Sequence, residues 1–121
     1  MSRFEELKIW QDGRVLVLCI YDALRNNKDY GFKDQLQRAT VSIMNNIAEG
    51  SDSGSDKQFI RFLQIAKASS SEVRSMLYLC GDLQYIDKDK NIELQEKVNN
   101  ISAGIQSLIN YLRVEVKGQR S

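Results

Sequence analysis

Residues 35–50 read QLQRATVSIMNNIAEG, and this stretch decides more about the fold than any other part of the chain. It reads as a helix with an unusual load of small and uncharged polar residues. It contains no set of residues that runs a known reaction. The stretch therefore predicts a fold and leaves the function open.

Length and composition set the class of protein. The chain has 121 residues, which is enough for one hydrophobic core and too few for two, so residues 1–121 are expected to form a single domain. Hydrophobic content of 42% and charged content of 27% are ordinary for a globular protein. Because proline is absent and periodic segments follow one another closely, we expect an all-α fold.

No segment has the length of a membrane span. The longest uninterrupted apolar run covers residues 15–21, far short of the roughly 20 residues that a spanning helix needs. The first six residues also lack the apolar core of a secretory signal. These features predict a cytoplasmic protein without a membrane partner.

Turn residues divide the sequence into four helices. Asn, Asp and Gly gather in residues 26–31, Gly50 fits a left-handed C-cap, and Ser55 with Gln58 forms a predicted capping box. The predicted helices cover residues 3–26, 32–49 and 56–85, with a fourth after the turn at residues 87–89. Because short connections make neighbours antiparallel, we predict an antiparallel up-down-up-down four-helix bundle.

The first predicted helix has more apolar surface than one bundle stripe requires. Its stripe consists of Leu7, Trp10, Val17, Ile20, Tyr21 and Leu24, and further apolar residues outside it are Val15, Leu16, Leu18 and Cys19. A helix that is apolar on more than one side is buried on more than one side. The surplus therefore indicates a surface for a partner.

The third and fourth helices carry clear inward faces. For residues 56–85 the predicted face consists of Phe59, Phe62, Leu63, Ala66, Val73, Met76, Leu77, Cys80 and Leu83. In the fourth helix a coiled-coil-like seam consists of Leu94, Val98, Ile101, Ile105, Leu108 and Leu112. Gly104 interrupts that helix at a cost of about 1 kcal/mol relative to Ala, which predicts a helix crossing tightly there.

A set of polar residues is predicted to meet inside the bundle. Helical spacing places Ser42, Asn46 and Glu49 on one face of the second helix. Ser69 and Glu72 share a face of the third. The favoured interpretation is a hydrogen-bonded structural network, and the alternative is a ligand or catalytic site.

Glu49 poses a question of its own. A carboxylate in the last turn of a helix is disfavoured by the helix dipole, so we expect Glu49 to have a partner. The candidates are Arg38, Arg61, Arg74 and backbone N–H groups of the following loop.

Residues for catalysis are missing from the sequence. The chain has no His and no Cys-x-x-Cys pair, so imidazole chemistry and structural zinc have no usable residues. Cys19 and Cys80 sit in apolar helical stretches and are expected to be buried, reduced thiols. We predict no catalytic residue, cofactor or metal, and a protein that is not an enzyme.

The charge of the chain is nearly balanced. Lys plus Arg total 17 against 16 for Asp plus Glu, whereas nucleic-acid-binding proteins usually show a basic excess or stripe. The C-terminus leans basic, although cations there also suit the helix dipole. The candidate contacts to nucleic acid are Arg3, Lys8, Arg14, Arg113, Lys117 and Arg120.

Four segments together resemble one family. They are the opening Phe4, Leu7 and Trp10 with Ile20-Tyr21, the Ser-Ile-x-x-Asn-Ile-Ala-Glu-Gly signature at residues 42–50, the segment 59–72 and the segment 108–113. They resemble the four-helix-bundle proteins encoded within intervening sequences of bacterial 23S ribosomal RNA genes. The resemblance implies a four-helix bundle and a ring-like homopentamer.

Related proteins are similar but differ in charge. Accessory proteins of diversity-generating retroelements look similar and bind nucleic acid and a reverse transcriptase, but they are markedly more basic than this chain. Here Met44 and Asn45 also stand where the family pattern often reads Pro-Ser, and Ala68 and Ser70 replace a common Gly and a common apolar residue.

Two functions remain open at the level of the sequence. In the first, an oligomeric scaffold or adaptor presents a multivalent surface to a protein partner, which the surplus of the first helix and the seam of the fourth favour. In the second, the ring gathers its basic residues into a rim that grips RNA or DNA.

Overall fold

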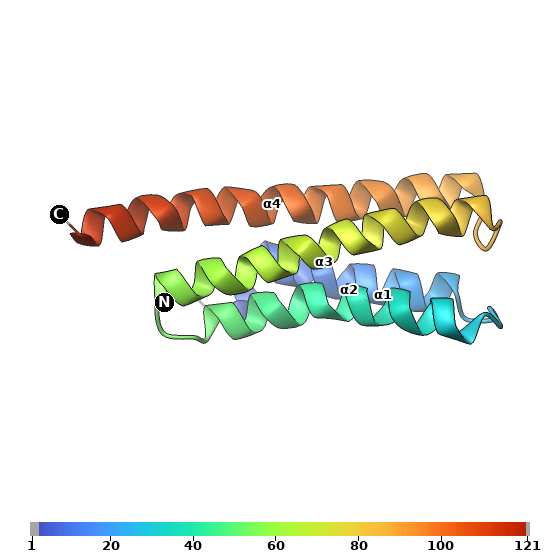
Figure 1. Ribbon diagram of the computed structural model, residues 1–121, viewed down its shortest axis with the longest axis horizontal. Helices are drawn as coiled ribbons and strands as arrows, with labels where there is room; N and C mark the ends of the chain where they lie inside the picture. Colours follow the sequence, from blue (N-terminus) through green and yellow to red (C-terminus); the bar gives the residue numbers. More distant parts are fainter. Residues whose placement is uncertain (1–2, 121) are drawn as a thin grey trace.

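The fold consists of helices that run back and forth along one axis. The computed structural model describes residues 3–120, with side chains for residues 3–118, and it contains no strand in that part of the chain. A 3₁₀ turn η1 precedes the helices, and the elements are η1 (Phe4–Glu6), α1 (Lys8–Ala23), α2 (Tyr30–Ser51), α3 (Asp56–Asp82) and α4 (Lys88–Arg120). Consecutive helices run in opposite directions (Figure 1), so the predicted all-α four-helix bundle is confirmed.

Side-chain caps fix where three of the helices begin. Asp29 Oδ1 accepts a hydrogen bond from the Phe32 N–H at 3.2 Å, and Ser55 Oγ accepts one from the Gln58 N–H at 3.2 Å. The predicted N-cap at Ser55 is therefore confirmed. Asp87 Oδ1 accepts from the Lys90 N–H at 2.7 Å, and α4 already begins at Lys88, inside the predicted turn.

The four helices share one hydrophobic core. α1 and α3 each pack on α2 and α4, so they lie diagonally across the bundle. Most of the predicted seam of α4 points into this core, where Leu94, Val98, Ile101, Ile105 and Leu112 are buried. Leu108 of the predicted seam is only half-buried, and Ile109, which was not predicted, is buried beside it. The seam is thus covered within the single chain.

The predicted inward faces of α1 and α3 need correction. Leu16, which was placed outside the α1 stripe, is fully buried, whereas Tyr21, which was placed in it, is exposed. The buried row is Leu16, Ile20 and Leu24, at four-residue steps. On α3 the predicted face is largely right, but Leu83 is exposed because the helix ends at Asp82 and the chain turns away.

Two glycines permit close contacts between helices. Gly50 lies within α2 and is buried, so the predicted left-handed cap is wrong. A Cβ at Gly50 would lie 2.8 Å from both Phe59 Cδ1 and Phe62 Cβ of α3. A Cβ at Gly104 would lie 2.7 Å from Ile9 Cγ2, so the tight crossing predicted at Gly104 is confirmed, with α1 as the crossing helix.

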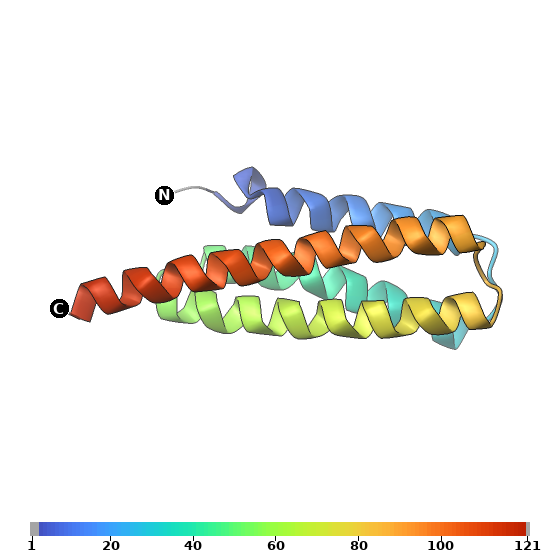
Figure 2. The ribbon, with the colours of Figure 1, turned by 90° about the horizontal axis from the view of Figure 1, so that it is seen from above.

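The two ends of the bundle differ. Both ends of the described chain lie at the end where α2 connects to α3 (Figure 2). At the other end the Tyr85 hydroxyl donates to Asp29 Oδ2 at 2.5 Å, and the rings of Phe32 and Tyr85 meet edge to face at 5.3 Å. These contacts tie the α1–α2 connection to the α3–α4 connection.

The bond between Tyr85 and Asp29 makes a pH-dependent prediction. The Tyr85 hydroxyl, and secondarily the Phe32 N–H, lower the pKa of Asp29 below its ordinary value. A depressed carboxyl pKa adds stability above the unfolded-state pKa, and this stability is lost as the pH falls through the folded-state pKa. We expect Tyr85→Phe to raise the Asp29 pKa in an NMR titration and to flatten the acid dependence of stability. An unchanged Asp29 pKa would contradict this role of Tyr85.

Candidate functional site

The predicted polar residues of α2 and α3 do meet. Ser42 Oγ lies 2.9 Å from Ser69 Oγ, and Asn46 Nδ2 donates to the Ser42 carbonyl at 2.9 Å and to Ser42 Oγ at 3.0 Å. Glu72 Oε2 accepts a bond from Gln35 Nε2 at 3.4 Å. The geometry is that of a network that holds α2 and α3 in register.

Glu49 does not join the network. Within residues 3–118 its exposed carboxylate makes no hydrogen bond or ion pair, so the prediction of a partner is wrong. Arg38, one predicted partner, binds Asp34 Oδ2 at 2.8 Å. Water solvates an exposed carboxylate well enough that no protein partner is required.

Asn46 and Glu49 also border a shallow surface depression beside α2. Its wall includes Asp34, Arg38 and Tyr21. Arg38 and Asp34 neutralise each other there, so the charge that remains in the depression is that of the Glu49 carboxylate. The structural interpretation is favoured because Ser42, Asn46 and Ser69 direct their hydrogen bonds to one another.

The network can be tested by removing its central amide. We expect Asn46→Leu to lower the free energy of unfolding by about 1 kcal/mol, because the hydrogen bonds to Ser42 are lost from a half-buried position. Urea unfolding measures this loss, and Asn45→Leu, at an exposed neighbour, is the matched control. If Asn46→Leu folds with unchanged stability and loses a binding activity instead, the network is a binding site and its role is not structural.

The N-terminal basic residues are largely engaged. Arg3 Nε lies 3.9 Å from Glu5 Oε2, and Lys8 Nζ lies 3.0 Å from Asp12 Oδ2. The Arg14 guanidinium lies over the Trp10 ring, 5.8 Å from its centroid. Carboxylates thus compensate the charges of Arg3 and Lys8.

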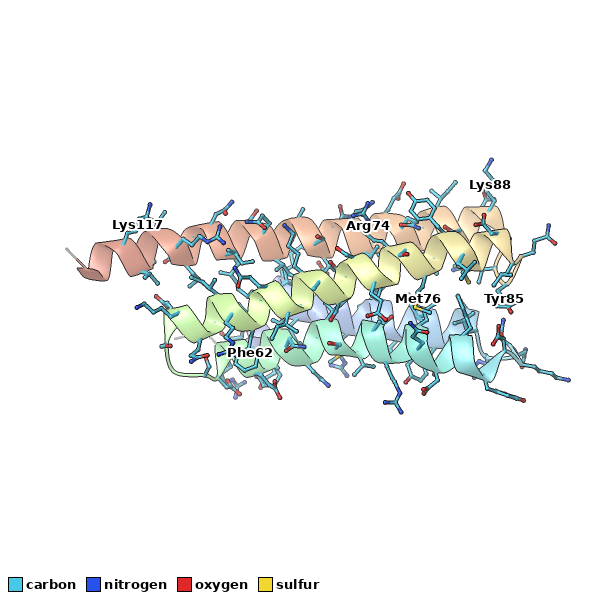
Figure 3. All side chains as sticks on the ribbon, in the orientation of Figure 1. Phe62, Arg74, Met76, Tyr85, Lys88 and Lys117 are labelled. Carbon is cyan, nitrogen blue, oxygen red and sulfur yellow. The ribbon has the colours of Figure 1, made fainter. Side chains whose placement is uncertain are left out.

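The C-terminal basic residues extend along α4 at the same end of the bundle (Figure 2). Lys117 is exposed near the end of α4 (Figure 3), and Arg113 borders a groove between α3 and α4. The side chain of Arg120 lies outside the described residues. The structure therefore brings both basic groups to one end of the bundle.

The outer face of α1 is the apolar surface that the sequence indicated. Leu18 is 62% exposed, Val15 47% and Tyr21 46%, and they follow one another at three-residue steps. We call these three residues the α1 outer face. Tyr21 replaces the predicted Leu16 in it, and Cys19 beside it is half-buried.

The structure also bears on thiol reactivity, metal binding and membrane insertion. Burial raises the pKa of the Cys80 thiol to about 11, so it stays protonated and unreactive near neutral pH. Among the described residues no three His, Cys, Asp or Glu side chains are grouped closely enough to hold a metal ion. The same part of the chain contains no helix long and apolar enough to cross a membrane.

Comparison with known proteins agrees with this architecture. The family model described as 23S rRNA-intervening sequence protein matches residues 5–107. The chain belongs to this family. The match includes the whole Ser42–Ser69 network and ends before the last part of α4, which carries Arg113 and Lys117.

A solved structure shows the same fold. It is a protein with unknown function from the S23 ribosomal protein family of Bacteroides thetaiotaomicron. The two chains are 24% identical, with 84% of this chain and 97% of that chain covered and a TM-score of 0.78. A search of curated proteins found no significant match.

The sequence missed one partner in the α2–α3 network. Gln35, which binds Glu72, lies seven residues before Ser42 and hence on the same face of α2. Extending the polar face by two turns would have found it.

Proposed function

We propose that this member of the 23S rRNA-intervening sequence protein family is a non-enzymatic, cytoplasmic scaffold. It assembles through the α1 outer face into a ring and presents a repeated surface to a protein partner. The observation that carries the proposal is the exposure of Val15, Leu18 and Tyr21 on a helix whose other side already fills the core. Covering such a face removes apolar area from water.

A ring needs two different surfaces on each copy. Head-to-tail contacts close into a ring when one patch of a subunit fits a different patch of the next. Besides the α1 outer face, Ile65 and Leu79 on α3 and Leu83 at its end are exposed. Because α1 and α3 lie diagonally in the bundle, these patches are on different sides.

Five copies is the number that the family resemblance implies, and we adopt a homopentamer. The seam of α4 contributes nothing to assembly, because it is buried within the chain's own core. Repetition of one weak contact raises the avidity for a partner without any new contact type.

A basic rim that grips RNA or DNA has less support. Arg3 and Lys8 face carboxylates of their own helix or turn, so repetition around a ring would not gather free positive charge at those residues. The scaffold is therefore the function that we favour.

Partner capture tests the scaffold directly. Wild-type protein and the Leu18→Lys variant are immobilised at equal density and exposed to lysate, with Val114→Lys as a control at an equally exposed apolar residue of α4. We expect a protein retained by wild type and Val114→Lys and lost by Leu18→Lys. Equal retention by all three forms would show that assembly is irrelevant to the partner.

A further inference from the structure

A second surface combines positive charge with an absence of carboxylates. It is a groove on the outside of α3 and α4, lined by Gln64, Lys67, Ala68, Ser71, Gln106, Ile109 and Arg113. We call it the α3–α4 groove. Its lining contains two cations and several amide or hydroxyl groups, but no acidic residue.

Amide side chains of α4 set the relation between the two helices. Asn91 Nδ2 donates to the Leu77 carbonyl at 2.6 Å, and Gln95 Nε2 donates to the Arg74 carbonyl at 3.3 Å. Gln106 continues this row toward the groove. The row itself is uncharged, and Asp82 and Asp87 lie near its Asn91 end, away from the groove.

Lys67 is held in the groove by a neutral partner. Its ammonium group donates to Gln106 Oε1 at 2.6 Å, and Gln106 Nε2 donates in turn to Asn110 Oδ1 at 2.9 Å. Lys8, in contrast, pairs with a carboxylate. Because the partner of Lys67 is a neutral amide, the groove keeps one positive charge in a fixed position.

Arg113 adds a second uncompensated charge. Its guanidinium is exposed and makes no hydrogen bond or ion pair to any residue that the structure describes. It lies seven residues beyond Gln106, which places it about 10 Å along α4 from the level of Lys67.

Arg74 extends the same line in the other direction. It lies seven residues after Lys67 on α3, about 10 Å away, where α3 and α4 run side by side (Figure 3). Its Nε is buried and has no hydrogen-bond partner among the described residues.

We propose that the α3–α4 groove binds the phosphate backbone of a single-stranded nucleic acid. Lys67 and Arg113 in the groove, with Arg74 on α3 beyond its lining, form a row of cations. Such a row fits a chain of phosphates better than one small anion, which would contact only one of them. The amides of the groove supply further donors to phosphate or sugar oxygens. This binding is separate from the proposed scaffold function and does not require it.

A charge-compensating variant tests the groove. Gln106→Glu keeps an acceptor beside Lys67 but places a carboxylate against its ammonium group. We expect its affinity for a short labelled single-stranded RNA, followed by fluorescence anisotropy, to fall about tenfold. A purely structural role of Lys67 and Gln106 would leave RNA affinity unchanged.

Circular dichroism shows whether Gln106→Glu folds. If it does not, a second variant tests the proposal. Lys67→Gln/Arg113→Gln removes both groove charges, and the slope of log affinity against log salt should become shallower by about 1.4, the value for two phosphate contacts of a single strand. The matched control is Lys57→Gln/Arg61→Gln, which removes the same charge from exposed residues outside the groove.

Three results would overturn the proposal. They are no binding of RNA by the wild type at low salt, an equal loss in the Lys57→Gln/Arg61→Gln control, and equally tight binding of polyglutamate of matched charge. The last result would assign the groove to acidic protein and not to nucleic acid.

Discussion

Leu18→Lys is expected to leave the bundle folded and to reduce the assembly to single chains of 13.9 kDa. Leu18 is 62% exposed in the single chain, so a lysine there loses no core contact. In an assembly built on the α1 outer face, the same lysine would bury an unpaired ammonium group in an apolar contact. Burying an unpaired charge costs several kcal/mol, which is enough to separate the copies.

The control for this prediction is Val114→Lys. Val114 is 66% exposed on α4 and lies outside the α1 outer face, so its replacement should leave the assembly intact. Light scattering gives the mass of each form, and circular dichroism gives its helix content. If Leu18→Lys retains the mass of the wild-type assembly, the α1 outer face is not the interface.

Gly50→Val is expected to lower the free energy of unfolding by about 3 kcal/mol, the upper part of the usual range for overpacking. The first added carbon would already lie 2.8 Å from Phe62 Cβ and Phe59 Cδ1 and 3.3 Å from the Phe59 carbonyl oxygen. The Phe62 Cβ is fixed to its backbone, so α2 and α3 must move apart. Such a loss is a large fraction of the 5–15 kcal/mol that stabilises a typical domain.

Gly31→Val is the matched control. Gly31 also lies in α2, but a Cβ there meets nothing within 4 Å. Urea unfolding should therefore give a stability close to that of the wild type. If Gly50→Val and Gly31→Val have the same effect, helix propensity and not the α2–α3 contact determines it.

The sequence predicted the helices well because the signals for them are local. The apolar rows of α3 and α4 follow the helical period, and caps such as Ser55 mark where helices begin. The close crossing at Gly104 was also predictable, because a glycine in a good helix has few other uses.

The inward face of α1 was harder to predict. Leu16 and Tyr21 both belong to apolar rows of the same helix, and nothing local decides which row faces the core. The contacts of α1 with α2 and α4 decide it, and those depend on the packing of the whole bundle. The C-cap prediction at Gly50 was wrong for a similar reason, because the close contact of Gly50 with Phe59 and Phe62 cannot be read from its own neighbours in sequence.

The candidate sites likewise divide into features that follow from local sequence and features that depend on how the helices pack. The meeting of Ser42 with Ser69 followed from helical faces and was predicted. The pairing of Lys67 with Gln106 depends on the register between α3 and α4, which the sequence alone does not set. The α3–α4 groove was therefore visible only in three dimensions.

The measurement that tests the central claim most directly is the mass of the wild-type protein by light scattering as it is diluted through the micromolar range. The scaffold predicts a mass several times that of the 13.9 kDa chain, and five times that mass for the ring. A mass of one chain at every concentration would contradict assembly through the α1 outer face and, with it, the proposed function.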